Sequence, residues 1–368
     1  MIKIADVISQ LEKWYPKTLA YEKDPVGLLL GSNAHPLTGV LVTLDVTEAV
    51  IDEAVSVGAN LIVAHHPVIY KPLKTIDLHT VKGRIVEKCI KNDISVYAMH
   101  TNYDIAEEGM NDVLAKALGL TKTSPLIKTH TDEFIKLAVY VPCTHVDEVR
   151  QAMGEAGVGQ IGYYSHCTFT TAGSGQFRPL AGSQPFIGNK GLLETVEEAK
   201  IEGVAPAAAV NEIMSKIRQV HPYEEIAYDV LPMNLGQAAK VYGLGRVGEV
   251  SEPMTAGDYV LFVKKAFGIN HARFSGQLQK KIKKVAVIGG SGSSFIWAAQ
   301  KAKADLYITG DIGFHDAQDA MEMGMNVLDV GHYAESLMKS HVGERLQEEF
   351  EEKSVHISQI NTDPFQFI

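Results

Sequence analysis

Six short apolar runs, spread from residue 39 to residue 335, limit what this chain can fold into more than any other feature. Each run is aliphatic or β-branched with few charges, which is typical of strands buried on both faces of a sheet. Most are followed by a stretch with helical spacing, and this alternation favours an α/β fold with a mainly parallel sheet. The runs are GVLVTLD (39–45), LIVAHH (61–66), SVYAMHTNYD (95–104), KVAVIGGSGSS (284–294), DLYITGD (305–311) and NVLDVGHYAE (326–335).

Polar side chains follow these runs at the points where the strands are expected to end. In an open α/β sheet, ligands collect at the carboxyl ends of the strands. A mixed set of imidazoles and carboxylates suits Zn, Mn or Fe better than Ca or a thiolate-bound structural zinc. The sequence therefore predicts a divalent-metal site assembled from both ends of the chain. The side chains expected there are His65, His66, His100, Asp104, Asp311, His332 and Glu335.

Each of these motifs also has a simpler interpretation. An isolated pair such as His65-His66 is more often one buried and one exposed histidine, and HTNYD (100–104) is rich in turn formers. If a helix begins at GHYAES, His332 and Glu335 face the same way, but glutamate also favours an exposed helix start. Together the motifs offer more ligands than one tetrahedral site uses. They suit two metal ions about 3.5–4 Å apart, and such a pair would support hydrolysis.

The strand and helix alternation breaks after residue 120. The segment TKTSPLIKTHTD (121–132) is polar with a proline and predicts a linker. Residues 134–231 predict the order β-α-β-β-β-α-β, with AGSG (172–175) as a turn, and suggest a ferredoxin-like α+β unit that closes at PMNLGQAAK (232–240). We expect a discontinuous α/β core domain of residues 1–129 and 237–368, and an inserted α+β domain of residues 130–236.

Other motifs offer further candidates. The serines and glycines of GGSGSS (289–294) stand between a strand and a helix, so they predict either an anion-binding loop or a tight βα turn. The loop residues are Ser291, Gly292, Ser293 and Ser294. His315 and His100 are candidate proton carriers. HPYEEIAYD (221–229) predicts the entry to an edge strand, with a ligand role as the less favoured alternative.

Composition excludes several classes of function. The formal charge of −10 over 368 residues argues against a protein that tracks along nucleic acid. The three cysteines are widely spaced, so they predict no disulfide framework and fit a reducing compartment. No window has about 18 uninterrupted apolar residues, the length that a membrane span requires. We therefore expect a cytoplasmic protein without membrane or strong nucleic-acid binding.

Several motifs, taken in order, resemble those of the NIF-three-like family, whose members are called GTP cyclohydrolase I type 2 homologs. The resemblance covers nearly the whole chain, and the insert is similar to that of the longer bacterial branch, whose inserted domain resembles the PII and CutA trimeric signalling folds. The motifs are AHHP (64–67), HTNYD (100–104), GGSGSS (289–294), TGD (309–311) and GHYAE (331–335).

The resemblance implies a dinuclear metal site, expected to hold two divalent ions per subunit, zinc first, with manganese or iron as alternatives. It also implies a homohexamer and a metal-dependent hydrolase acting on a nucleotide or pterin-like ring; the sequence does not identify the small-molecule substrate. A non-enzymatic metal-handling or regulatory assembly is the alternative, and a phosphoesterase is a weaker one. The ligands carried over are His65, His66, Asp104, His332 and Glu335.

Overall fold

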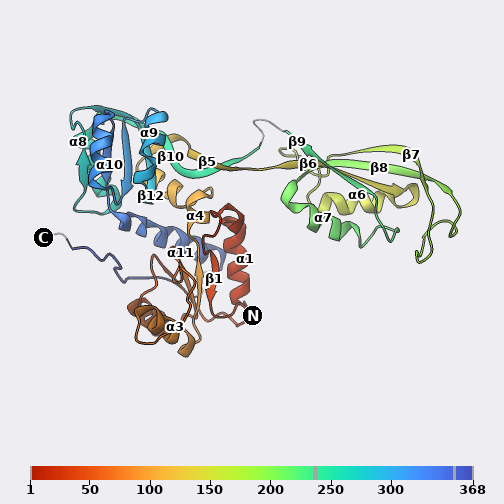
Figure 1. Cartoon of the computed structure of the whole chain (residues 1–368), viewed down its shortest axis with the longest axis horizontal. Helices are drawn as coiled ribbons and strands as arrows, with labels where there is room; N and C mark the ends of the chain where they lie inside the picture. Colours follow the sequence, from red (N-terminus) through yellow and green to blue (C-terminus); the bar gives the residue numbers. More distant parts are fainter. Residues whose placement is uncertain (1, 235–238, 351–353, 367–368) are drawn as a thin grey trace. The chain divides into compact units, whose positions relative to one another are not determined.

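The computed structural model describes residues 2–234, 239–350 and 354–366 (Figure 1). The chain forms two compact units, one of Met1–His130 with Tyr242–Ile368 and the other of Thr131–Val241. The expected boundary at residues 236 and 237 lies outside the described residues, so the domain limits stay a prediction.

The first sheet of the larger unit has the strand order β1-β4-β3-β2-β15. All neighbours are parallel except β1 and β4. Alternate side chains of β2 to β4 pack against α1 on one face and against α2 and α3 on the other, as the apolar runs predicted. The elements are α1 (Ile4–Trp14), β1 (Gly27–Leu30), β2 (Val40–Thr43), α2 (Glu48–Ser56), β3 (Leu61–Ala64), α3 (Val81–Lys91), β4 (Ser95–Ala98) and β15 (Val355–Ile357).

The second sheet of this unit has the order β11-β14-β13-β12-β10-β5. Its three central strands β12, β13 and β14 are parallel, whereas β10 and β11 run antiparallel to their neighbours β12 and β14. The elements are β5 (Leu120–Thr131), β10 (Val241–Thr255), α8 (Ala256–Phe267), β11 (Arg273–Ser275), β12 (Lys281–Ser291), α9 (Ile296–Lys301), β13 (Leu306–Gly310), α10 (Phe314–Glu322) and β14 (Asn326–Asp329).

The predicted linker at residues 121–132 is wrong, because most of this segment is the edge strand β5. Its side chains are mostly exposed or half-buried, so it lacks the apolar pattern of an interior strand. Pro125 is tolerated because an edge strand has one unpaired side.

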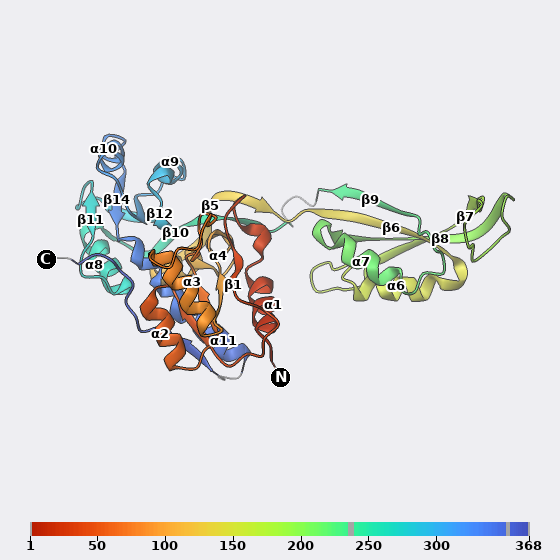
Figure 2. The ribbon, with the colours of Figure 1, turned by 60° about the horizontal axis from the view of Figure 1, so that its bottom comes forward.

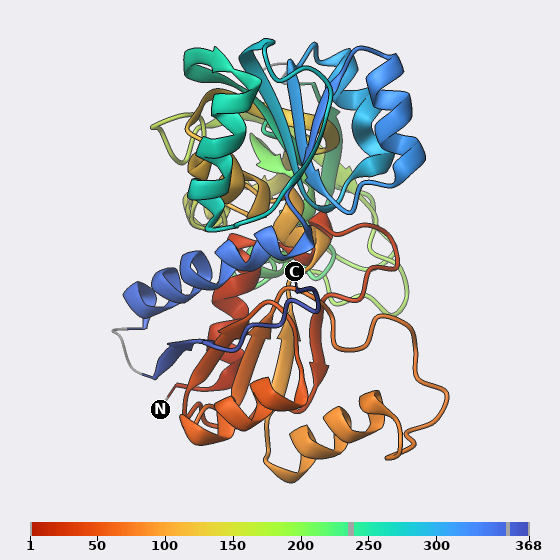
Figure 3. The same cartoon turned by 90° about the vertical axis from the view of Figure 1, so that its left-hand side faces the viewer.

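One hydrophobic core joins the two sheets. Val63 of β3 and Ile308 of β13 belong to the same cluster of buried side chains. The helix α11 (Met338–Glu349) packs on β2 and β15 of the first sheet and on α5 (Met110–Ala117), and it crosses between the sheets in Figure 3. The short helix α4 (Thr101–Ile105) follows β4 directly. This packing brings strand ends from distant parts of the sequence together.

The smaller unit is a four-stranded antiparallel sheet of order β7-β8-β6-β9. Helices α6 and α7 lie on the same face of this sheet (Figure 2). The chain order is β-α-β-β-α-β, the ferredoxin-like order. The elements are β6 (Phe134–Pro142), α6 (Val146–Glu155), β7 (Thr168–Phe177), β8 (Glu194–Pro206), α7 (Val210–Ile217) and β9 (Tyr228–Met233).

The predicted turn at AGSG is also wrong. Residues 172–175 lie inside β7, which pairs with β8 without a break from Thr168 opposite Gly203 to Phe177 opposite Glu194. Gly175 leaves room for a side chain of the neighbouring strand, since a Cβ on it would lie 2.0 Å from Oε2 of Glu198. The expected α/β fold with an α+β insert is confirmed, and its likeness to PII and CutA stays a prediction. Short 3₁₀ helices complete the described elements: η1 (Lys17–Leu19), η2 (Cys143–His145), η3 (Ala207–Ala209), η5 (Ser293–Phe295) and η6 (His332–Leu337).

Candidate metal centre

Two adjacent histidines leave the carboxyl end of β3 and are held by different partners. His65 has only 1% of its surface exposed, and its Nδ1 donates a hydrogen bond to the Met99 carbonyl oxygen at 2.7 Å. His66 is half-buried, and its Nδ1 donates to Oδ1 of Asp45 at 2.7 Å. Because Nδ1 is occupied in both rings, each presents Nε2 to the space beyond the strand.

The opposite side of the cluster comes from η6, which follows β14. Glu335 is 2% exposed, and its Oε2 lies 3.2 Å from Nε2 of His66 and 3.3 Å from Nε2 of His332. The same oxygen lies 3.6 Å from Nε2 of His65. His332 and Glu335 thus share a helical turn, as their spacing predicted, and one carboxylate oxygen faces three imidazoles.

Asp104, on α4, completes the buried group. Its Oδ1 lies 3.6 Å from Nε2 of His65 and is a buried oxygen without a hydrogen-bond partner among the described residues. A buried carboxylate oxygen left without a donor is costly in a folded protein. A cation bound beside His65 would satisfy it, so the residues present fit a metal ion.

Carboxylates and a carbonyl orient every histidine of the cluster. His332 Nδ1 donates to Oδ2 of Asp311 at 2.7 Å, and His100 Nδ1 donates to Oδ1 of Asp24 at 2.8 Å. Metal-binding histidines usually donate their other ring nitrogen in this way, which fixes the tautomer and raises the basicity of the ligand atom. Asp311 adopts a left-handed backbone conformation with φ of 55°, a strained state that tends to persist at functional sites.

The donor atoms form two groups that share Glu335. One group is His65, Asp104 and Glu335, and the other is His66, His332 and Glu335; within each, the ligand atoms lie within 4.8 Å of one another. A third group combines His100 with His65 and His66. These groups could hold a metal ion, and the first two have the carboxylate of Glu335 in common.

Burial, neighbouring charges and hydrogen bonds shift the pKa values of the clustered side chains. Burial would raise the pKa of Glu335, but the positive charge of His65 and hydrogen bonds from His332, His65 and His66 hold it well below its ordinary value. Burial opposes the charged form of His66, yet hydrogen bonds to Asp45 and Glu335 raise its pKa to about 10. Burial raises the pKa of Asp104 to about 6 despite the neighbouring charge of His65. Without a metal, protons on the imidazoles balance the buried carboxylates.

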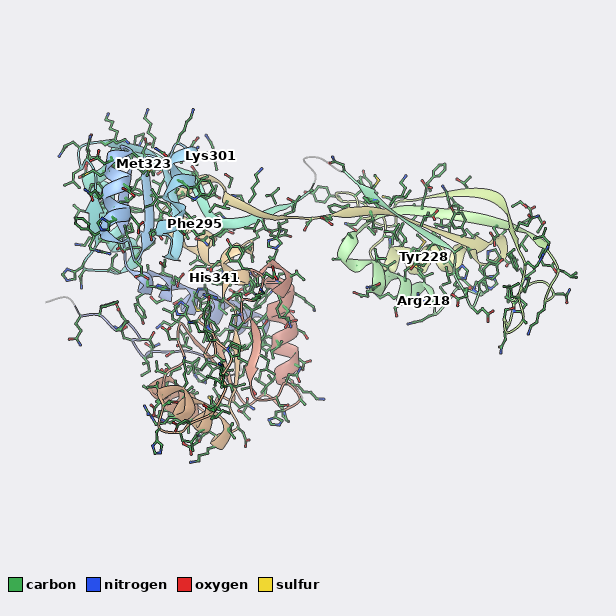
Figure 4. All side chains as sticks on the ribbon, viewed as in Figure 1. Arg218, Tyr228, Phe295, Lys301, Met323 and His341 are labelled. Carbon is green, nitrogen blue, oxygen red and sulfur yellow. The ribbon has the colours of Figure 1, made fainter. Side chains whose placement is uncertain are left out.

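The glycines of GGSGSS make room for the buried glutamate. A Cβ on Gly289 would lie 2.9 Å from Oε1 of Glu335, and a Cβ on Gly290, whose φ is 61°, would lie 2.8 Å from it. The later part of the motif is a turn: the Gly292 carbonyl accepts from Tyr307 and from the backbone of Phe295, which Figure 4 labels. The anion-loop role of Ser291, Gly292, Ser293 and Ser294 stays a prediction.

The remaining sequence candidates differ in their positions. His100 joins the cluster, whereas His315 is exposed at the start of α10 and contacts Phe314, with no contact to the cluster in the described part of the chain. Asp24 and Asp45 hold histidines but were not expected to. Asp45 ends one of the apolar runs and could have been found by its place after β2, while Asp24 lies in no recognisable motif.

Comparisons with known proteins identify the family of this chain and agree with its fold. The chain matches the family model Duf34/NIF3 (NGG1p interacting factor 3) over residues 2–364. It therefore belongs to the Duf34/NIF3 family, which confirms the expected family resemblance. None of the helices that the structure describes has the length and apolar character needed to cross a bilayer.

Several relatives are similar over their full length. A GTP cyclohydrolase 1 type 2 homolog of Halalkalibacterium halodurans is 46% identical over 374 residues, with 100% of both chains covered. A protein of the same name from Bacillus subtilis is 46% identical, with 98% of each chain covered. A Bacillus cereus protein related to NIF3 has a crystal structure with 45% identity and a TM-score of 0.90, covering 100% of this chain and 99% of that one.

Proposed function

We propose that this chain is a metal-dependent hydrolase with a dinuclear divalent-metal centre, acting on a nucleotide or a pterin-like ring. His65 and Asp104 would hold one ion, His66 and His332 the other, and Glu335 would bridge them. The observation that carries the proposal is the pair of ligand groups that share Oε2 of Glu335, beside the unpartnered Oδ1 of Asp104.

Zinc is the metal we expect first, since imidazole and carboxylate ligands at a mixed site suit zinc, with manganese or iron as alternatives. Divalent ions in such a pair act as Lewis acids and lower the pKa of water toward neutrality. The buried carboxylates then need no protonated imidazoles to balance their charge, which fits a resting state with neutral His65 and His66.

His100 is the proton carrier that the geometry favours over His315. Its Nδ1 donates to Asp24, so Nε2 is the nitrogen that can accept or release a proton beside His65 and His66. Burial would raise the pKa of Asp24, but hydrogen bonds from His100 and Thr101 lower it, so Asp24 stays ionised and keeps the ring oriented. The ring of Tyr70, which is 60% exposed, faces His100 and would contact a bound substrate.

We propose hydrolysis as the reaction class for two reasons. A pair of divalent ions favours attack by water, and the relatives are named GTP cyclohydrolase 1 type 2 homologs. The test is turnover by the full-length protein loaded with Zn, Mn or Fe and supplied with GTP, other nucleotides and reduced pterins. Products are identified by mass spectrometry. We expect ring-opened product from the wild type, and a loss of at least about 100-fold in kcat for His100→Gln, in the range of general acid–base effects.

His315→Gln is the matched control, because His315 is an exposed histidine outside the cluster, and it should leave kcat unchanged. Full metal occupancy without turnover of any of these compounds would contradict the hydrolase. Transfer of metal to an apoprotein under the same conditions would support the metal-handling alternative instead.

Assembly and location belong to the same proposal. We propose a homohexamer in the cytoplasm. The exposed apolar side chains of the edge strand β9 support the hexamer, because an uncovered edge is a surface for pairing. The described cysteines form no disulfide, and Cys89 is buried, which fits the cytoplasm.

A further inference from the structure

A pocket of about 290 Å³ lies wholly within the smaller unit, whereas all the candidate metal ligands belong to the larger one. Its volume lies just below the range typical of small-molecule sites, roughly 300–1,000 Å³. The walls come from the end of β7, the segment before β8, Glu198 of β8 itself, and residues 223–227 of the HPYEEIAYD motif. Tyr228, labelled in Figure 4, begins β9 just after this wall.

Aromatic rings and acids together line the pocket. The ring centroid of Tyr223 lies 5.9 Å from that of Phe177 and 6.5 Å from that of Phe186. Phe186 is 52% exposed and forms the outer part of the wall. Phe177, Phe186 and Tyr223 all line the pocket, and aromatic rings are a general means of holding an organic cation.

The charged lining residues are all negative: Glu198, Glu224 and Glu225. Tyr223 donates its hydroxyl to Oε1 of Glu198 at 2.8 Å, and the backbone N–H of Gln184 donates to Glu224. No lysine or arginine in the described ranges forms an ion pair with these glutamates. Lys200, near Glu198 on β8, instead pairs with Glu202.

Gly175 leaves room for the carboxylate of Glu198 in the pocket wall. Oε2 of Glu198 lies over Gly175, where a Cβ would come within 2.0 Å of it. Gly173, two residues earlier on the same face of β7, has open space where its Cβ would stand. Glu198 is half-buried, and within the described part of the chain its Oε1 accepts from Tyr223 while its Oε2 has no hydrogen-bond donor, so a ligand could donate to Oε2.

We propose that this pocket binds a small organic cation with a flat apolar body, such as an amidinium or guanidinium compound. The cationic group would form paired hydrogen bonds with Glu198, and the flat body would lie among Phe177, Phe186 and Tyr223. This assigns the HPYEEIAYD motif a ligand-binding role that does not depend on the metal centre.

The test is calorimetric titration of the full-length protein with benzamidine, benzamide and benzoate, which share a ring and differ in charge. Benzamidine should bind at one site per chain, with benzamide at least about tenfold weaker, since a hydrogen bond to a charged group carries that difference. Benzoate should not bind. Equal binding of benzamide and benzamidine, or no saturable binding of benzamidine up to about 10 mM, would overturn the proposal.

Two matched pairs of variants locate the site. Glu198→Gln should weaken benzamidine binding about tenfold, whereas Glu197→Gln, on the opposite face of β8, should leave it unchanged. Gly175→Ala displaces only a flexible carboxylate and should weaken binding, whereas Gly173→Ala should not. Circular dichroism checks that each variant is folded. Wild-type affinity in both Glu198→Gln and Gly175→Ala would exclude this pocket.

Discussion

Nε2 of His66 lies 3.2 Å from Oε2 of Glu335, although 269 positions separate the two residues in the sequence. His66 follows a strand of the first sheet and Glu335 follows a strand of the second, so this contact joins the carboxyl ends of both. The shared core between the sheets holds these ends together. The candidate centre is therefore a property of the whole larger unit, and neither half of the sequence can build it alone.

The carboxylates behind the histidines should tune metal affinity without changing the number of ions. Asp45→Asn and Asp311→Asn keep a hydrogen-bond acceptor for His66 and His332 but remove its charge. We expect each to lower divalent-metal affinity about 10- to 100-fold, measured by competition with a chromogenic chelator.

Asp52→Asn is the control for these variants, because Asp52 of α2 forms a largely exposed ion pair with Lys88 of α3, away from the cluster. Unchanged affinity in both Asp45→Asn and Asp311→Asn would mean that these carboxylates do not support metal ligands.

The insert should be separable from the metal centre. The N–H of Asp132 donates to the carbonyl of Lys240 at 2.9 Å, so the two chain connections to the insert run side by side. A short Gly/Ser linker can therefore replace residues 130–236 without straining the second sheet. We expect the shortened protein to retain its metal content by elemental analysis, and residues 130–236 to fold alone. Loss of metal from a folded, shortened protein would show that the insert shapes the site.

His221 should make the insert less stable at acid pH. It is 7% exposed; its Nε2 donates to the Tyr140 carbonyl and its Nδ1 accepts from the Tyr223 N–H, so only the neutral ring fits. Burial lowers its pKa. Above a pH of about 6.5, the ordinary pKa of histidine, His221 is neutral in both the folded and the unfolded chain. As the pH falls below this value, His221 is protonated first in the unfolded chain, so the free energy of unfolding of the insert falls by at most about 1.4 kcal/mol per pH unit.

Hydrogen exchange of β6 and β9 peptides between pH 5 and 7.5, corrected for intrinsic rates, measures this loss in the full-length protein. His221→Gln keeps a donor for Tyr140 but cannot titrate, so its protection should vary less with pH. The same pH dependence in variant and wild type would assign the effect to other groups.

The interior of the fold was predictable because its strands are buried on both faces. Val40, Leu61 and Val96 belong to such strands, and their apolar runs leave little alternative to an interior strand. The residues after those strands, such as His65 and His66, were predictable as a cluster because parallel strands place their carboxyl ends at one edge.

The edges of the sheets and the supporting carboxylates were harder to predict. The edge strand β5 carries exposed polar residues, among them Lys122, which pairs with Glu249 of β10. Its residues alternate in no apolar pattern and resemble those of a loop, because its exposed side chains are not packed against a core. Asp24 holds His100 through a contact between segments 76 residues apart, which no local spacing reveals.

The assembly prediction rests on the edge strand β9. Tyr228, Val230 and Leu231 are exposed on it, and an uncovered edge is a surface for pairing. Closed symmetric assembly is a common way to cover such a surface. Light scattering should report a mass near six times 40.1 kDa, and removal of the insert should give a smaller species that keeps its metals. A monodisperse monomer at micromolar concentration would refute the hexamer.

Metal stoichiometry tests the central claim most directly. Protein produced with adequate Zn, Mn or Fe and then dialysed is measured by elemental analysis, together with His65→Ala, Glu335→Ala and the control His145→Ala in the insert. We predict about two divalent ions per chain in the wild type and the control. Both site variants should contain fewer, since Glu335 belongs to both groups that contain a carboxylate and His65 belongs to one of these two. Full occupancy in both site variants would contradict the assigned centre.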